Sequence, residues 1–187
     1  MQQVGILGGG FNPPHKAHLF VVTDALSSGL FDEIWVIPCY HHAFEKDEAL
    51  IPFEQRLNMC KLAFNQWGNV KVLDVERKLQ TQYTVDLMTN LIHTNPDTKF
   101  TLIVGSDNVE GMEKWKYWNI LKNLVYYYIA PRARGSHWKW ALPDISSTEI
   151  RTLLAAHKTN VPYVQRMLPE AVFQYIEDKK LYRGENP

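Results

Sequence analysis

The chain has few cysteines, no excess of charge of either sign and no long apolar run, and each of these absences excludes a class of protein. Cys39 and Cys60 are too few for a disulfide framework or a zinc-ligand cluster, so both are expected to be buried free thiols. Twenty basic residues balance twenty acidic ones, which leaves no broad positive field to hold a long nucleic acid. We therefore expect no nucleic-acid partner, while a local site for a small anion stays open.

No apolar stretch approaches the roughly 20 residues that span a bilayer, and the N-terminus lacks the basic segment and long apolar stretch of a signal peptide. The sequence thus predicts no membrane partner and a cytoplasmic location. The chain has 187 residues, of which 45% are hydrophobic and 21% charged, as is usual for one folded domain. We expect a single domain over residues 1–187, with C-terminal helices at 147–183 packed on it.

Short apolar runs alternate with helical segments along the chain. Strands are predicted at residues 4–7, 33–37, 70–75, 100–104 and 124–129. Helices are predicted at residues 17–28, 52–67, 84–92, 147–156 and 169–179, with Pro52 as the first residue of its helix. This alternation predicts an α/β fold, a Rossmann-like doubly wound parallel sheet with helices on both faces. The loops at 40–50 and 131–143 follow predicted strands, where ligands of open α/β sheets bind.

The stretch GGGFNPPHKAH, residues 8–18, combines the least constrained residues with the stiffest ones. Glycines let a ligand approach the backbone and permit positive φ, while Pro13 and Pro14 stiffen the loop. His15 and His18 stand near the start of a helix, and their spacing places them on one face. Because helix N-termini bind phosphate, the pattern predicts a phosphate site, with a turn and two surface histidines as the alternative. The stretch is neither the GxGxxG dinucleotide fingerprint nor a P-loop.

A second motif, ISSTEIR, occupies residues 145–151. Ser147 or Thr148 is expected to cap the helix that follows, and Arg151 falls near the start of that helix. The alternative is a capped helix that carries a surface arginine.

Together the two motifs resemble the nucleotidylyltransferase superfamily, which carries an (H/T)xxH motif after the first strand and an S/TxxR-type motif near the C-terminus. Within it, the chain most resembles the nicotinate or nicotinamide mononucleotide adenylyltransferases. Further segments match that family in order: YTVDLM, GSDN, WKYW, PRARG and YIEDKKLY. The resemblance covers roughly residues 4–183, which implies one nucleotidylyltransferase domain.

Two departures from the family pattern concern the ligand site. The family often has Thr or Ser where Gly10 stands, so a hydroxyl near the phosphates is missing. Many bacterial members carry a Pro-Pro-His-Lys tract after the second strand, whereas this chain reads YHHAFEK there. Lys46 is a loose match for the lysine of that tract.

The resemblance implies adenylyl transfer from ATP to nicotinate mononucleotide, giving deamido-NAD and pyrophosphate in NAD biosynthesis. It implies three catalytic residues, His15, His18 and Arg151. It implies ATP contacts at Gly8, Gly9, Gly10, Phe11, His15, His18, Gly105, Asp107, Arg132, Ser147, Thr148 and Arg151. It implies mononucleotide contacts at Asn12, Lys46, Thr84 and Trp115. Mg²⁺ is expected to arrive with ATP, with no metal site built by the protein.

The implied roles are phosphate hydrogen bonds from the two histidines, a bidentate pyrophosphate clamp by Arg151, a ribose contact by Asp107 and ring stacking by Trp115. Structural alternatives are a helix cap at Asp107, a helix N-cap at Thr84 and a solvated arginine at Arg132. Trp118 is expected to pack on the same helix face as Trp115. Other acceptors, namely nicotinamide mononucleotide, phosphopantetheine, a sugar phosphate or a flavin, and a catalytically silent nucleotide sensor are the alternative functions. A homo-oligomer is left open.

Overall fold

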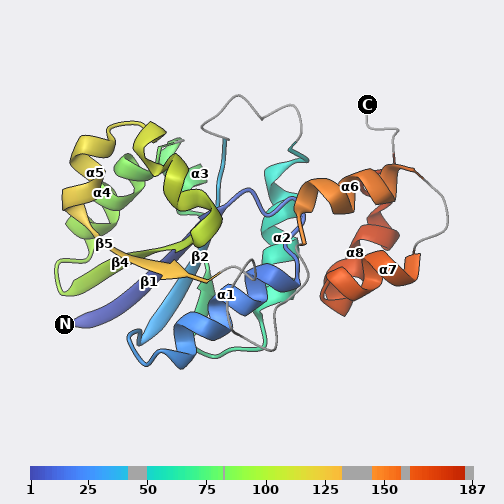
Figure 1. Ribbon diagram of the computed structural model, residues 1–187, viewed down its shortest axis with the longest axis horizontal. Helices are drawn as coiled ribbons and strands as arrows, with labels where there is room; N and C mark the ends of the chain where they lie inside the picture. Colours follow the sequence, from blue (N-terminus) through green and yellow to red (C-terminus); the bar gives the residue numbers. More distant parts are fainter. Residues whose placement is uncertain (42–49, 82, 132–144, 157–160, 184–187) are drawn as a thin grey trace.

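The computed structural model describes residues 1–41, 50–81, 83–131, 145–156 and 161–183, which form a parallel sheet between layers of helices (Figure 1). The strands are β1 (Gln2–Gly9), β2 (Glu33–Pro38), β3 (Val70–Val72), β4 (Thr98–Gly105) and β5 (Tyr126–Ala130). Their spatial order is β3-β2-β1-β4-β5, and every neighbouring pair is parallel. The predicted α/β class with a parallel sheet is confirmed.

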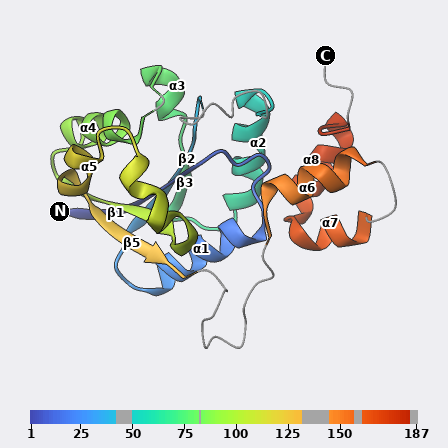
Figure 2. The ribbon, with the colours of Figure 1, turned by 45° about the horizontal axis from the view of Figure 1, so that its top comes forward.

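Helices cover both faces of the sheet, as predicted. One face packs against α1 (Lys16–Ser27) and α2 (Phe53–Phe64). The other face packs against α3 (Val75–Leu79), α4 (Thr84–Thr94), the 3-10 helix η2 (Ser106–Lys114) and α5 (Trp118–Leu124). The C-terminal helices α6 (Ser147–Ala155), α7 (Val161–Met167) and α8 (Glu170–Lys179) gather beside α2 in both views (Figures 1 and 2).

The central strands supply side chains to two separate cores. On β1, Val4 and Ile6 pack under α4, while Leu7 packs under α1 and α2. On β2, Ile34 and Val36 pack with Leu7. Strands buried on both faces read as continuous apolar runs, which is why these runs could be recognised in the sequence.

Several boundaries differ from the prediction. Pro52 is the N-cap residue of α2, with ψ 141°, and so precedes the helix instead of beginning it. The third strand stops at Val72 because Val75 already begins α3, and the fifth begins at Tyr126 because α5 continues to Leu124. The unpredicted helices α3, α5 and α7 have only 5, 7 and 7 residues, too few turns to show a helical period. The unpredicted η2 is a 3-10 helix, whose three residues per turn differ from the α-helical period.

The strand order reverses between β1 and β4. From β1 the chain continues through α1 to β2 on one side, and from β4 it continues to β5 on the other. The carboxyl ends of β1 and β4 therefore border a crevice, and ligands of open α/β sheets bind at such a point. Gly8 and Gly9 close β1 and Gly105 closes β4, which places two sequence-predicted segments at this edge. None of the described helices has the length and apolar character needed to cross a membrane.

Candidate active site

The loop between β1 and α1 is packed into the protein. Residues 11 to 15 are all buried. Phe11 has φ 45°, in the left-handed region that bulky side chains seldom adopt. Its ring contacts Phe64 and His18, with centroid separations of 6.1 and 4.9 Å. The Asn12–Pro13 peptide bond is cis. The left-handed backbone of Phe11, held by its ring contacts, is typical of a segment whose shape is needed for function.

The glycines before this loop leave room at the surface. Among the described residues, Gly29 is the glycine with positive φ, so Gly8, Gly9 and Gly10 do not use the conformational freedom expected of them. A Cβ on Gly8 would meet no described atom within 4 Å, whereas one on Gly5 would lie 2.7 Å from Ile103 Cδ1. A side chain at position 5 would thus force Ile103 to shift, whereas the space beside Gly8 at the end of β1 is open.

His15 and His18 form one unit at the start of α1. His15 is the N-cap residue, and its backbone N–H donates to Nδ1 of His18 at 3.1 Å. The two rings stack with centroids 3.8 Å apart. Because Nδ1 of His18 accepts a hydrogen bond, the neutral ring carries its proton on Nε2. His15 is 2% exposed and His18 is half-buried, so His18 is the one that can present a donor to a ligand.

The second motif docks on the same loop. Ser147 Oγ donates to the carbonyl of Pro13 at 2.9 Å, across 134 positions of sequence. Arg151 donates from Nη1 to the carbonyl of Asn12 at 2.8 Å and from Nη2 to Thr148 Oγ1 at 3.3 Å. A guanidinium has five N–H donors, so it can add contacts to a ligand. The structure thus brings the two sequence motifs together.

The predicted cap of α6 is wrong. Ser146 is the N-cap residue, and its Oγ accepts from the backbone N–H of Glu149 at 3.1 Å. The hydroxyl groups of Ser147 and Thr148 are directed instead to Pro13 and Arg151. With adjacent serines and a threonine, the sequence offers three candidate caps, and only the docking of α6 on the loop decides among them.

A buried arginine that the sequence analysis missed links β1 and β2. Arg56 is 1% exposed. Its Nη1 donates to the carbonyls of Gly10 at 3.0 Å and Cys39 at 2.7 Å, and its Nη2 donates to the carbonyl of Tyr40 at 3.3 Å. Nε donates to the carbonyl of Ile51 at 3.1 Å. The signal in the sequence was a charge in line with Met59, Cys60 and Ala63, which share the buried face of α2.

Glu76 of α3 holds the same β2 exit from the other side. Its carboxylate accepts from the backbone N–H of Tyr40 at 3.0 Å. Burial raises the pKa of Glu76 to about 7, although the hydrogen bond from Tyr40 and the charge of Arg56 act in the opposite direction. Both the protonated and the ionised carboxyl group keep an oxygen that can accept this hydrogen bond. Arg56 and Glu76 therefore fix the backbone at residues 39 and 40.

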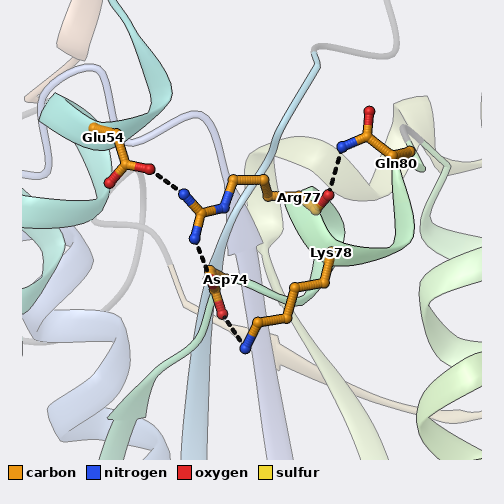
Figure 3. A network of polar contacts seen from close by, with 5 residues as sticks. All are labelled: Glu54, Asp74, Arg77, Lys78 and Gln80. Atoms are coloured by element: carbon orange, nitrogen blue, oxygen red, sulfur yellow. Dashed lines mark hydrogen bonds and ion pairs between the residues drawn. The ribbon is translucent and has the colours of Figure 1, made fainter.

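A polar network attaches α3 to the start of α2 (Figure 3). Arg77 pairs with Glu54 of α2, and also with Asp74 at 2.6 Å. Lys78 pairs with Asp74 at 2.8 Å. Hydrogen bonds from Lys78 and Arg77 lower the pKa of Asp74. Partly exposed ion pairs contribute little one by one, but these contacts join α3, which carries Glu76, to the start of α2.

Some predicted site residues cannot be placed. Lys46 and Arg132 lie outside the described residues, and so does the side chain of Asp107. The backbone of Asp107 lies in η2, whose N-cap residue is Gly105, so Asp107 does not hold the cap position considered for it.

Thr84 and Trp115 lie on the face of the sheet that carries α4 and α5. Thr84 begins α4 with Tyr83 as N-cap, so the alternative that Thr84 is itself the cap is wrong. Trp115 is half-buried after η2, and Trp118 begins α5 beyond a left-handed residue at 117 with φ 56°. The prediction that the two tryptophans share one helix face is therefore wrong. Trp118 packs against Tyr127, with ring centroids 5.7 Å apart.

Both cysteines are free thiols. Cys60 is buried, which raises its pKa, but Cys39 is only half-buried, so the expectation of burial holds for one of the two. Among the residues that the structure places, no three His, Cys, Asp or Glu side chains gather in a way that could hold a metal ion.

Comparison with known proteins gives a consistent result. The cytidylyltransferase-like family matches residues 6–153. A protein of Anaeromyxobacter dehalogenans, named a probable nicotinate-nucleotide adenylyltransferase, is 38% identical over 98% of each chain. Two structures of Plasmodium falciparum nicotinic acid mononucleotide adenylyltransferase are similar in fold, one complexed with APC (TM-score 0.75, 22% identity) and one with NaAD (TM-score 0.74, 23% identity). Each similarity covers 97% of this chain and 98% of the other.

Proposed function

The chain belongs to the cytidylyltransferase-like family, and we propose that it is the enzyme that transfers the adenylyl group of ATP to nicotinate mononucleotide, forming deamido-NAD and pyrophosphate. Relatives that match nearly the whole chain carry the name probable nicotinate-nucleotide adenylyltransferase. The observation that carries the proposal is the docking of Ser147 and Arg151 on the loop that precedes His18. A sensor would need to bind ATP but would not need the reacting phosphates aligned.

In the proposed reaction, a phosphate oxygen of the mononucleotide attacks the α-phosphorus of ATP. A new P–O bond forms, the bond to the bridging oxygen breaks, and pyrophosphate leaves with the electron pair. No protein nucleophile is required, because the attacking group is already an anion. Catalysis then consists of aligning the reactants and stabilising the charge that develops on phosphate oxygens.

In this proposal the residues of the site have different roles. Gly8, Gly9 and Gly10 let the triphosphate lie against the backbone. His18 donates from Nε2 to a phosphate oxygen, and His15 fixes the His18 ring through the backbone hydrogen bond to Nδ1. Arg151 contacts the pyrophosphate end with two of its donors. We place Phe11, Gly105, Asp107, Arg132, Ser147 and Thr148 around the remainder of ATP.

We propose that Mg²⁺ enters with ATP. Such an ion would keep much of its hydration shell and would need no dedicated protein cage. It would supply charge neutralisation at the phosphates, while the residues of the chain supply orientation.

The mononucleotide is proposed to bind Asn12, Lys46, Thr84 and Trp115. Thr84 begins a helix of 11 residues, whose free N–H groups favour the carboxylate of the nicotinate ring. One observation favours the nicotinamide ring instead. Asp86 adds a negative charge in the first turn of α4, where its carboxylate accepts from Thr81 Oγ1 at 3.0 Å.

Incubation of the protein with ATP, Mg²⁺ and each mononucleotide tests both points, with pyrophosphate and dinucleotide product measured. We expect kcat/KM at least about tenfold higher with nicotinate mononucleotide, which corresponds to about 1.4 kcal/mol. Equal or better efficiency with nicotinamide mononucleotide would reverse the ring preference and leave the reaction class intact. If neither acceptor gave pyrophosphate or dinucleotide while ATP still bound tightly, the result would support the alternative function of a catalytically silent nucleotide sensor.

Gly8 gives a prediction about ATP. Because a Cβ on Gly8 would point into open space at the proposed phosphate site, Gly8→Ala should leave the melting temperature nearly unchanged. It should raise the KM for ATP about five- to tenfold, since even one added methyl group is costly in a tightly filled site. Gly68→Ala is the control. Gly68 is equally open, but it precedes β3 and so lies at the amino end of its strand, whereas Gly8 lies at the carboxyl end of β1. An unchanged KM for ATP in Gly8→Ala would remove Gly8 from the site.

A further inference from the structure

The chain after α8 turns back to the loop between β1 and α1. Lys180 and Tyr182 both have left-handed backbones, with φ 52° and 63°, and the N–H of Leu181 donates to the carbonyl of Ile176 at 3.0 Å. Tyr182 is 7% exposed and belongs to the core between the sheet and α2. A bulky side chain stays in this region of backbone space only where its contacts impose it.

The contact of Tyr182 is with the loop itself. Its hydroxyl donates to Oδ1 of Asn12 at 2.8 Å, across 170 positions of sequence. Burial raises the pKa of Tyr182, so the hydroxyl keeps the proton that it donates. Asn12 is 3% exposed, and its backbone carbonyl accepts from Arg151. Asn12 therefore has two partners. Its side chain binds Tyr182 of the C-terminal segment, and its backbone carbonyl binds Arg151.

We propose that Tyr182 is a positioning residue for adenylyl transfer, in which its hydroxyl fixes Asn12 and Asn12 fixes Arg151. The inference rests on the proposed function. The cytidylyltransferase-like match includes Asn12 and Arg151 but ends at residue 153, so this support comes from a part of the chain outside the match.

The physical basis is the cost of misalignment. Without the hydroxyl, a buried amide loses a hydrogen-bond partner, and Asn12 can rotate or shift to find another. Any shift of Asn12 moves the carbonyl that holds Arg151. Transfer between two bound phosphates depends on alignment, so a small displacement lowers the rate more than it lowers binding.

Tyr182→Phe tests the proposal because it removes only the hydroxyl. We expect kcat to fall about five- to tenfold, as for the loss of one hydrogen bond, with the KM for ATP within about twofold of the parent. Tyr175→Phe is the matched control: Tyr175 is on α8 and its hydroxyl donates to Gln55 of α2 at 2.6 Å, away from the loop. Its kcat should equal that of the parent at a similar melting temperature.

A double mutant separates positioning from general stability. If Tyr182 acts through Arg151, then Tyr182→Phe should change kcat by less than about twofold when added to Arg151→Lys. A full five- to tenfold loss in that background would overturn the proposal, and so would a single Tyr182→Phe variant as active as Tyr175→Phe. An inactive parent protein would instead count against the proposed function, so the two failures are distinguishable.

Discussion

His18→Ala is expected to lower kcat about 100- to 1000-fold, while the KM for ATP changes by less than about threefold. This is the usual effect of removing one donor that acts on charge developing in a transition state. The structure identifies Nε2 as the donor atom, because Nδ1 of His18 accepts from the backbone of His15 at 3.1 Å. Steady-state kinetics with purified parent and variant proteins measure the effect.

His18→Asn distinguishes the two roles of the ring. The carboxamide oxygen of asparagine can take the place of Nδ1 and accept from the His15 backbone, but asparagine has no atom at the Nε2 position. We therefore expect His18→Asn to keep the melting temperature of the parent and to lose as much turnover as His18→Ala. His93→Ala, at the exposed end of α4, is the control and should be fully active. Turnover within threefold of the parent in both His18 variants would show that His18 only accepts the hydrogen bond from the His15 backbone at the start of α1.

The site residues that the sequence analysis proposed lie mostly in two contiguous motifs, residues 8–18 and 145–151. His15, His18, Ser147 and Arg151 each stand in a short motif near a predicted helix start. That the two motifs share one site was implied by the family resemblance and not by any local pattern. The faces of the strands were equally predictable, since burial on both sides leaves an apolar run. The sequence also predicted that the glycines at 8–10 let a ligand approach the backbone, which the open surroundings of Gly8 fit, whereas the positive φ that glycine permits is not used there.

The supports of the site were not predictable, because they depend on contacts between distant elements. Arg56 lies on the buried face of α2 in line with Met59, Cys60 and Ala63, and nothing local indicates that it binds the carbonyls of Gly10 and Cys39. Tyr182 is 170 positions from Asn12. Ser146 and Ser147 are neighbours with the same hydroxyl group, and the different partners they take depend on how α6 docks. Such choices are made by tertiary packing and leave no periodic signal.

Arg151→Lys is expected to lower kcat/KM for ATP about 10- to 150-fold, although the charge is kept. Arg151 must hold the carbonyl of Asn12 and clamp phosphate oxygens at the same time. A planar guanidinium can do both with separate N–H groups, whereas an ammonium is a single point of charge. The loss of one charge-assisted hydrogen bond, about 1.5–3 kcal/mol, gives this range.

Arg166→Lys is the matched control, since Arg166 is an exposed arginine of α7 in the same C-terminal group of helices. Its kcat/KM should stay within twofold of the parent, which would show that arginine-to-lysine exchange has no general effect on this region. Melting temperatures of all three proteins should agree closely, because Arg151 is half-buried and its contact with Thr148 is exposed. If Arg151→Lys kept its kcat/KM but melted at a lower temperature, Arg151 would be a latch between α6 and the loop with no part in binding phosphate. A loss of kcat/KM at an unchanged melting temperature is the result that the clamp requires.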